Sequence, residues 1–394
     1  MQVRDLVALA GADSKATADH VILLWMSGGM SHIDTFDPKP GRETGGEFEP
    51  IETSAPGVVV SEILPKVAKQ MKHAAIVRAI AGTQGDHGQA TYNLLTGYQT
   101  TPQLVHPSIG SVTVHELAPK SDLPAFVSIG GRALSAGYMG QKCEAYYIGN
   151  PGQPDPYLQL PEGIAQVRAN RRLEVLTELN KKTAAARPDP ELAATDATYR
   201  AAVKFMESPA LQAFQLEKEK PEVREAHGPS AFGRGCLLAR RLVEQGVRFV
   251  QVSAGGFDTH VNNFPAMRNL GAMIDAGIGS LVEDLAASGL LKRTLVMVLS
   301  EFGRTPTINM TAGRDHHPAV FSTFMAGGGV RSGIVLGSSD EDGRMPKDRP
   351  VRVADLHATV CTTLGIDPAK EVITPLRRPM RLVDKGEPVR DLLA

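Results

Sequence analysis

The apolar residues of this chain gather in short runs that do not alternate strictly with polar residues. Valine, isoleucine and leucine dominate these runs, each of which has the length of a strand. Strands that are covered on both faces, as in a parallel sheet between two layers of helices, show this continuous apolar pattern. The predicted strands are residues 21–26, 74–80, 124–129, 247–252, 294–299 and 321–326.

Segments with helical spacing of apolar residues lie between and after these runs. In residues 232–245, Leu237, Leu238 and Leu242 recur on one helical spacing, and Gly246 follows as a stop signal. The other predicted helices are residues 87–95, 267–287 and 355–364. Alternating strands and helices predict an α/β fold, a three-layer α/β/α sandwich with a mostly parallel central sheet.

The composition changes in one part of the chain. Residues 161–228 are rich in alanine, charged residues and leucine, and prolines 188 and 190 interrupt them, which indicates a helical insertion. We therefore expect a single α/β domain over residues 21–394 with an insertion at about 161–228. Residues 1–20 contain a short apolar run and one arginine, which is not a complete signal peptide.

Charge and hydropathy argue against several classes of protein, namely nucleic-acid binders and membrane proteins. The chain of 394 residues has 42 basic and 43 acidic residues, and this balance argues against binding to nucleic acid or to an anionic membrane surface. A membrane helix needs about 20 apolar residues, far more than the longest run offers, so no membrane span is predicted. The three cysteines are widely spaced, which argues against a zinc knuckle or a disulfide framework.

Candidate chemistry lies where the predicted strands meet their loops. Ligands of α/β sheets bind beyond the carboxyl ends of the strands, and the loops there contain acidic residues, histidines and arginines. Imidazole with carboxylate suits Zn²⁺ or Mn²⁺, and carboxylates suit Ca²⁺, so we expect one divalent metal ion of these kinds. The candidates are Ser27, His32, Asp34, Asp86, His87, Asp258, His260, Glu301, Arg304, Arg314, His316 and His317.

Simpler interpretations exist for several of these residues. Asp86 and Asp258 are each as well placed to cap the following helix as to bind a ligand. His316 and His317 could be a surface pair. Glu301 is harder to explain in this way, because a carboxylate directly after a buried strand is costly without a partner.

Long motifs identify a family. The strings VILLWMSGGMSHIDTFDPKP, GDHGQATYNLLTGY, FGRGCLLARRLVEQGVRFVQVSAGGFDTH, LVMVLSEFGRTPTIN and GRDHHPAVFSTFMAGGG closely resemble the bacterial family called domain of unknown function 1501. The resemblance extends from Val21 to the carboxyl terminus and implies a branch of the alkaline phosphatase and sulfatase superfamily. It also implies export by a twin-arginine signal, so residues 1–20 would be the remnant of that signal and the parent protein would be periplasmic or extracellular.

The resemblance also implies a metal site. The Asp-His loop of the superfamily matches Asp258 and His260 at a shorter spacing, and the late histidine ligand matches His316. At the second metal position, Ser27 and Phe302 stand where the superfamily has an aspartate and a histidine. We therefore expect at most one strong metal site, unless His32, Asp34 or His87 rebuilds the second. Ser27, His32, Asp34 and His317 are the candidates for a second site or for substrate contacts.

The catalytic roles are likewise implied by the resemblance. Counting back from Leu95-Thr96-Gly97 places His87 at the nucleophile position, where it would act as nucleophile or general acid/base with Asp86 orienting it. Glu301 would be a metal ligand or a base, and Arg304 and Arg314 would neutralise the charge of the ester.

These roles imply a metal-dependent hydrolase of phosphate or sulfate esters whose substrate is an anionic small molecule or glycan ester. No Cys/Ser-x-Pro/Ala-x-Arg string precedes Leu95-Thr96-Gly97, so a formylglycine-dependent sulfatase is not expected. The alternative is a degenerate superfamily member that binds an anionic glycan or a partner protein without turnover. A phosphoryl-transferring isomerase or transferase is a third interpretation.

Overall fold

One large sheet organises the computed structural model, which describes residues 16–153, 158, 162–186 and 190–394. Its strands run in the order β12 (Ile334–Leu336), β4 (Ala74–Ala81), β11 (Phe321–Ala326), β8 (Thr294–Leu299), β1 (His20–Met26), β7 (Phe249–Ala254), β5 (Phe126–Ile129) and β6 (Tyr146–Ile148), and β15 (Val351–Arg352) pairs with β4. The pairs described within this sheet are parallel, except for the two that β11 makes with β4 and β8. The predicted, mostly parallel sheet is confirmed.

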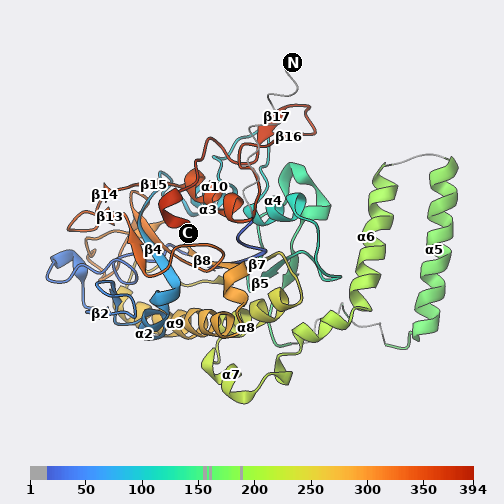
Figure 1. Ribbon diagram of the computed structural model, residues 1–394. Coiled ribbons are helices and arrows are strands. Elements are labelled where there is room, and N and C mark those ends of the chain that lie inside the picture. Colours follow the sequence, from blue (N-terminus) through green and yellow to red (C-terminus); the bar gives the residue numbers. More distant parts are fainter. Residues whose placement is uncertain (1–15, 154–157, 159–161, 187–189) are drawn as a thin grey trace.

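Helices cover both faces of this sheet (Figure 1). Successive side chains of a strand point to opposite faces, and β1 shows this clearly. Ile22, Leu24 and Met26 share one buried cluster with α2 (Pro65–Gln70), α8 (Ala231–Glu244) and α9 (Asn263–Ala287). Val21, Leu23 and Trp25 share another with α3 (His87–Thr96), α4 (Ile109–Glu116) and α10 (Val353–Thr363). The three-layer α/β/α sandwich predicted from the sequence is therefore what the structure has.

The predicted elements lie close to the observed ones. The strands predicted at 294–299 and 321–326 coincide with β8 and β11, whereas the strand predicted at 247–252 lies two residues later, as β7. The helix predicted at 267–287 begins earlier, at Asn263. Pro265 lies in the first turn of this helix. Proline is well tolerated there because the first N–H groups of a helix have no intrahelical partner.

The segment predicted as an insertion contains α5 (Gln166–Ala186), α6 (Pro190–Met206) and α7 (Pro221–Ala226). Figure 1 shows α5 and α6 standing apart from the sheet. Pro188 and residues 1–15 lie outside the described residues. Of the predicted amino-terminal extension, Ala18 is buried and His20 already belongs to β1. Among the described helices, none combines the length and the apolar character that crossing a lipid bilayer requires.

Short elements complete the described chain. The two-stranded pairs are β2 (Pro50–Glu52) with β3 (Val59–Ser61), β9 (Gly303–Arg304) with β10 (His316–His317), β13 (Ser338–Ser339) with β14 (Pro346–Asp348), and β16 (Glu371–Ile373) with β17 (Pro379–Arg381). The 3₁₀ helices are η1 (Glu43–Gly45), η2 (Met71–His73), η3 (Gly137–Met139), η4 (Gln141–Cys143), η6 (Pro209–Phe214), η7 (Leu216–Lys218), η8 (Leu290–Arg293) and η9 (Arg390–Leu392).

The strand directions bring several loops to one edge of the sheet. β1, β4, β7 and β8 are mutually parallel, so the loops that follow them begin at the same edge. Because β11 runs in the opposite direction, the segment that precedes it ends at the same edge. The β9–β10 pair joins two of these segments, with Arg304 opposite His316. The topology thus gathers residues from distant parts of the chain.

A buried histidine in α10 should make the stability of the fold sensitive to acid. His357 is 4% exposed and donates a hydrogen bond from Nε2 to the carbonyl of Leu94 at 2.8 Å. Burial lowers its pKa from 6.5 to about 4. Between these pH values the unfolded chain binds a proton that the folded chain excludes, so stability falls as the pH drops through this window.

We expect the acid-induced loss of unfolding free energy over this window to be about 3 kcal/mol larger in the wild type than in His357→Gln, which keeps an amide donor for Leu94. Urea unfolding at a series of pH values measures this difference. Equal pH dependence in the two proteins would contradict the assigned burial effect.

Candidate metal centre

The amino terminus of α3 positions His87. The preceding residue, Asp86, is the N-cap of the helix, and its carboxylate accepts the backbone N–H of Gln89 at 2.9 Å. The helix ends at Gly97, whose φ of 77° is readily adopted by glycine. Asp86 therefore performs the capping role that the sequence had left open, and its carboxylate is exposed to solvent.

The loop after β7 carries Asp258 and His260. Between them, the carbonyl of Thr259 accepts the N–H of Arg314 at 3.0 Å, and the Thr259 hydroxyl donates to Asn263 at 2.6 Å, at the start of α9. Asn309 also donates to the carbonyl of His260 at 3.0 Å. These contacts hold the backbone of the loop, while the side chains of Asp258 and His260 stay half-exposed.

Three imidazoles converge on one carboxylate oxygen. Asp258 Oδ1 lies 3.5 Å from His87 Nε2, 3.0 Å from His260 Nε2 and 3.3 Å from His316 Nε2. The ligand atoms of His87, Asp258 and His316 all lie within 4.8 Å of one another. A tetrahedral ion with bonds of about 2.1 Å separates its ligands by about 3.4 Å. The three distances to Asp258 Oδ1 are close to this separation, and the group whose ligand atoms all lie near one another consists of His87, Asp258 and His316.

The other ring nitrogen of each histidine contacts an oxygen that can only accept a hydrogen bond. His87 Nδ1 lies 2.8 Å from Glu301, His260 Nδ1 lies 2.7 Å from Asp315, and His316 Nδ1 lies 2.7 Å from the carbonyl of Gly85. If each Nδ1 donates its proton, the Nε2 atom of the neutral ring presents a lone pair. Histidines that bind metals are commonly held in this tautomer by such an oxygen.

Two details show that these donors fit a cation. His87 Nε2 is buried and has no hydrogen-bond partner. His260 Nε2 and His316 Nε2 face each other at 3.0 Å, where two lone pairs would repel unless a proton or a metal ion lies between them. The donor set of imidazoles and one carboxylate suits Zn²⁺ or Mn²⁺.

Arg304 keeps the central carboxylate charged. Its side chain is fully buried and donates to Asp258 Oδ1, to the carbonyls of Gly28 and Gly29, and to the carbonyl of Arg314. Burial opposes ionisation of Asp258, but the hydrogen bond and the charge of Arg304 outweigh it and lower the pKa of Asp258 to about 2. Asp258 is therefore an anion at neutral pH, as metal ligation requires.

Glu301 has the partners that its buried position demands. It is 2% exposed and lies beside His87 Nδ1 at 2.8 Å, while it accepts the N–H of Gly28 at 2.8 Å and the hydroxyl of Ser300 at 3.2 Å. These contacts place Glu301 behind His87 rather than among the converging Nε2 atoms. Glu301, and not Asp86, is the carboxylate that orients the His87 ring.

Arg314 and Asp34 form a buried ion pair. Both side chains are fully buried, with Arg314 Nε 3.0 Å and Nη2 3.1 Å from the two Asp34 oxygens. The remaining donors of Arg314 bond to the carbonyls of Thr305, Pro306 and Thr44. All of the guanidinium N–H groups are thus in use, and the structure leaves neither Arg314 for an ester nor Asp34 for a metal.

The other candidates for a second site are not brought together around an ion. His32 is buried and its Nε2 bonds to the carbonyl of Gly343, while His317 Nε2 bonds to the carbonyl of Arg344. Burial lowers the pKa of His32 to about 4. Ser27 is exposed. The ring of Phe302 packs against His87 and His316, with centroid distances of 4.9 Å and 4.6 Å.

The sequence offered two roles for His87, as nucleophile or general acid/base and as a residue that could rebuild a second metal site, and the structure places His87 Nε2 among the donors around Asp258. Sequence reasoning missed one feature of this cluster. It gave Asp315 no chemical role, although Asp315 contacts His260. Its position directly before His316, in a loop rich in acid and imidazole, was the only signal for it.

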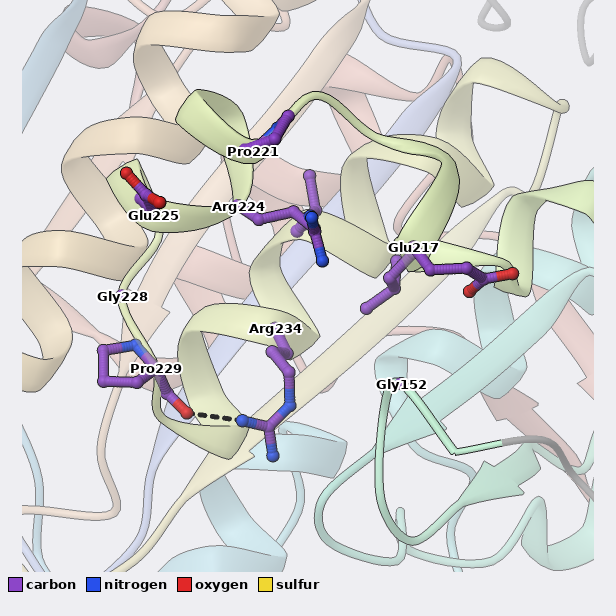
Figure 2. A pocket seen from close by; sticks show the side chains of 10 residues that line it. Gly152, Glu217, Pro221, Arg224, Glu225, Gly228, Pro229 and Arg234 are labelled. Carbon is purple, nitrogen blue, oxygen red and sulfur yellow. Dashed lines mark hydrogen bonds between the residues drawn. The ribbon is translucent and has the colours of Figure 1, made fainter.

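A separate cavity of about 480 Å³ is lined by residues of α7 and α8 and of the segments beside them, and none of the clustered residues is among its lining residues (Figure 2). Figure 2 shows Arg234 directing its guanidinium to the carbonyl of Pro229. Arg234 also donates to the carbonyl of Pro151 at 3.1 Å. Backbone carbonyls therefore occupy the guanidinium of Arg234. The candidate centre is assigned to the histidines around Asp258 because of their metal-binding chemistry, and not because of the size of a cavity.

Comparisons with known proteins give distant likenesses. The comparison with curated proteins gives no match. Solved structures similar to this chain include the PsFucS1 sulfatase from Pseudoalteromonas sp., with 14% identity, a TM-score of 0.43, and coverage of 92% of this chain and 70% of that chain. The phosphonate monoester hydrolase SpPMH from Silicibacter pomeroyi has 11% identity and a TM-score of 0.41, with 95% and 76% covered.

A third similar structure is the carboxyl-terminal periplasmic domain of EcEptC from Escherichia coli, in complex with Zn, with 12% identity, a TM-score of 0.41, and 97% and 94% covered. At these identities and TM-scores the likenesses carry no conclusion about activity. A family model described as "Protein of unknown function (DUF1501)" matches residues 18–393. The family resemblance seen in the sequence is confirmed, and this chain belongs to the DUF1501 family.

Proposed function

We propose that this protein is a hydrolase of phosphate or sulfate esters that depends on one divalent cation held by His87, Asp258 and His316, with His260 as a fourth donor. The observation that carries the proposal is the convergence of three Nε2 atoms on Asp258 Oδ1 at 3.0–3.5 Å. A cation bound there would polarise an ester oxygen or lower the pKa of a water molecule.

The surrounding residues have roles that follow from their contacts. Glu301 holds the His87 ring through Nδ1, and Asp315 does the same for His260. Arg304 keeps Asp258 ionised. The groups that meet at Asp258 Oδ1 are imidazoles and a guanidinium, so we propose that water, and not a side chain of this cluster, is the nucleophile. A covalent formylglycine route has no part in this proposal.

Accessibility supports a role in small-molecule chemistry. The side chains of His87, His260 and His316 are 37%, 41% and 26% exposed, so a substrate can reach the cluster from solvent. Arg304 and Arg314, by contrast, are fully buried. We propose that these arginines set the shape and charge of the site without direct contact to the ester.

The test is a screen of aryl phosphates, phosphodiesters and aryl sulfates with Zn²⁺, Mn²⁺ or Ca²⁺ present. We expect metal-dependent turnover that falls at least about a hundredfold in His87→Ala, since one ligand and its contact to Glu301 are lost. His115→Ala is a matched control, because His115 is also 37% exposed and also contacts a glutamate, Glu116, at 2.8 Å.

Two results would contradict the proposal. One is turnover that survives complete removal of divalent metal, and the other is full activity in His87→Ala. Tight binding of an anionic polysaccharide without turnover of any ester would favour the second candidate, a binding module. The family resemblance favours this candidate, because it implies that Ser27 and Phe302 stand at two metal-ligand positions.

A further inference from the structure

We infer that the ester bound at this centre carries a single negative charge, as a phosphodiester or a sulfate monoester does, and that a doubly charged phosphate monoester is disfavoured. This inference rests on the proposed function, because it concerns the substrate class of the same site. It follows from the charges that surround the donors and from the arginine N–H groups that are already in use.

The charges around the cluster are balanced once a divalent cation is present. The carboxylates in contact with its histidines are Asp258, Glu301 and Asp315. The ion pairs recorded for these carboxylates are with histidines and with Arg304. With neutral histidines, the three negative charges equal the combined charge of Arg304 and a divalent ion. Each negative charge on a bound substrate then adds to the net negative charge of the site.

The donors of Arg304 and Arg314 are committed to the protein. Arg304 is fully buried and uses four of its five N–H groups on Asp258 and on backbone carbonyls. Arg314 uses all of its donors on Asp34 and on backbone carbonyls. An anionic oxygen is best stabilised by a charged donor that can reach it, and these two guanidiniums are buried and bonded to other partners.

A singly charged ester needs only the cation as its partner. The second charge of a phosphate monoester would meet no free guanidinium from Arg304 or Arg314, and the exposed carboxylate of Asp315, which contacts His260, adds a further negative charge beside the cluster. Hydrolysis itself adds a charge: water adds oxygen to the phosphorus or sulfur, the bond to the leaving oxygen breaks, and the products are an alcohol, a dianion and a released proton. The same repulsion then favours departure of the product.

Binding of a matched pair of ligands tests the inference without turnover. The probes are phenylphosphonate, at a pH where it is a dianion, and its monomethyl ester, which is a monoanion of similar shape. Calorimetric titration of the Zn²⁺-loaded protein should show the monomethyl ester binding at least about tenfold more tightly, a difference of about 1.4 kcal/mol. Equal or tighter binding of the dianion overturns the inference, and so does failure of both ligands to bind.

A turnover comparison separates this inference from the proposed function. The pair is 4-nitrophenyl methyl phosphate and 4-nitrophenyl phosphate, which share a leaving group and differ by one charge. Preference for the singly charged ester supports the inference. Faster metal-dependent hydrolysis of the doubly charged ester would support the hydrolase and overturn the inference. If neither is hydrolysed, the proposed hydrolysis of phosphate esters fails, and the binding result alone decides the charge preference.

Asp315→Asn tests the electrostatic cause. Its side chain is 52% exposed, and asparagine still offers an oxygen to His260 Nδ1. Removing one negative charge should reduce the preference for the monoanion several-fold. Asp348→Asn is the matched control, since Asp348 is also exposed and pairs with Arg349 outside the cluster. An unchanged preference in Asp315→Asn, or an equal change in Asp348→Asn, would overturn the assigned cause.

Discussion

Replacing Asp258 by alanine is expected to lower the affinity of the protein for Zn²⁺ at least about a hundredfold, with the wild type binding about one ion per chain. Loss of a group that only supports a metal ligand lowers metal affinity about 10–100-fold. Asp258 should matter at least as much, because the three imidazoles converge on its Oδ1 atom. Metal analysis after dialysis and calorimetric titration measure stoichiometry and affinity.

Asp258→Ala has a second effect that needs a control. It leaves the buried guanidinium of Arg304 without its carboxylate partner, so the fold could be weakened. His316→Ala removes a converging donor without this effect, because His316 Nδ1 bonds only to the carbonyl of Gly85. We expect a similar loss of affinity in His316→Ala and a smaller one in Glu301→Gln, which acts through His87.

The metal proposal fails if the wild-type protein binds no divalent ion at any concentration tested. It also fails if His316→Ala binds Zn²⁺ as tightly as the wild type while its thermal unfolding is unchanged. Either result would mean that the imidazoles are held together by hydrogen bonds alone, with a shared proton between His260 and His316.

Arg314→Leu is expected to lower the free energy of unfolding by about 3–5 kcal/mol, since it leaves Asp34 buried without its counter-charge. Both groups are fully buried, and the pair is bidentate at 3.0 Å and 3.1 Å. Asn263 would remain the donor to Asp34, at 2.9 Å, and a neutral amide cannot balance the charge. Urea unfolding measures the change.

Two variants make this result specific. In Arg314→Leu combined with Asp34→Asn, the stranded charge is removed, so the loss should be smaller than the sum of the single losses. Arg268→Leu breaks an exposed pair with Glu47, 53% and 58% exposed, and should cost no more than about 1 kcal/mol. Additive losses, or a loss in Arg314→Leu as small as in Arg268→Leu, would show that the buried pair contributes little.

The layers of the fold could be predicted from the sequence because they depend on local pattern. The apolar runs at 294–299 and 321–326 became β8 and β11, since a strand buried on both faces needs apolar residues at every position. Parallel strands bring their carboxyl ends to one edge, so the sequence could also predict that acidic residues and histidines of several loops gather there. The choice of Asp258, His260 and His316 among them as metal ligands came from the family resemblance.

What each polar side chain does was decided only by the tertiary structure. Asp86 and Glu301 are both acidic residues beside a strand end, yet one caps a helix and the other orients His87. Arg304 and Arg314 are ten residues apart, and one contacts Asp258 while the other pairs with Asp34, 280 residues away in sequence. Sequence periodicity determines which face of an element is buried, whereas the partner of a buried charge depends on which distant loop reaches it.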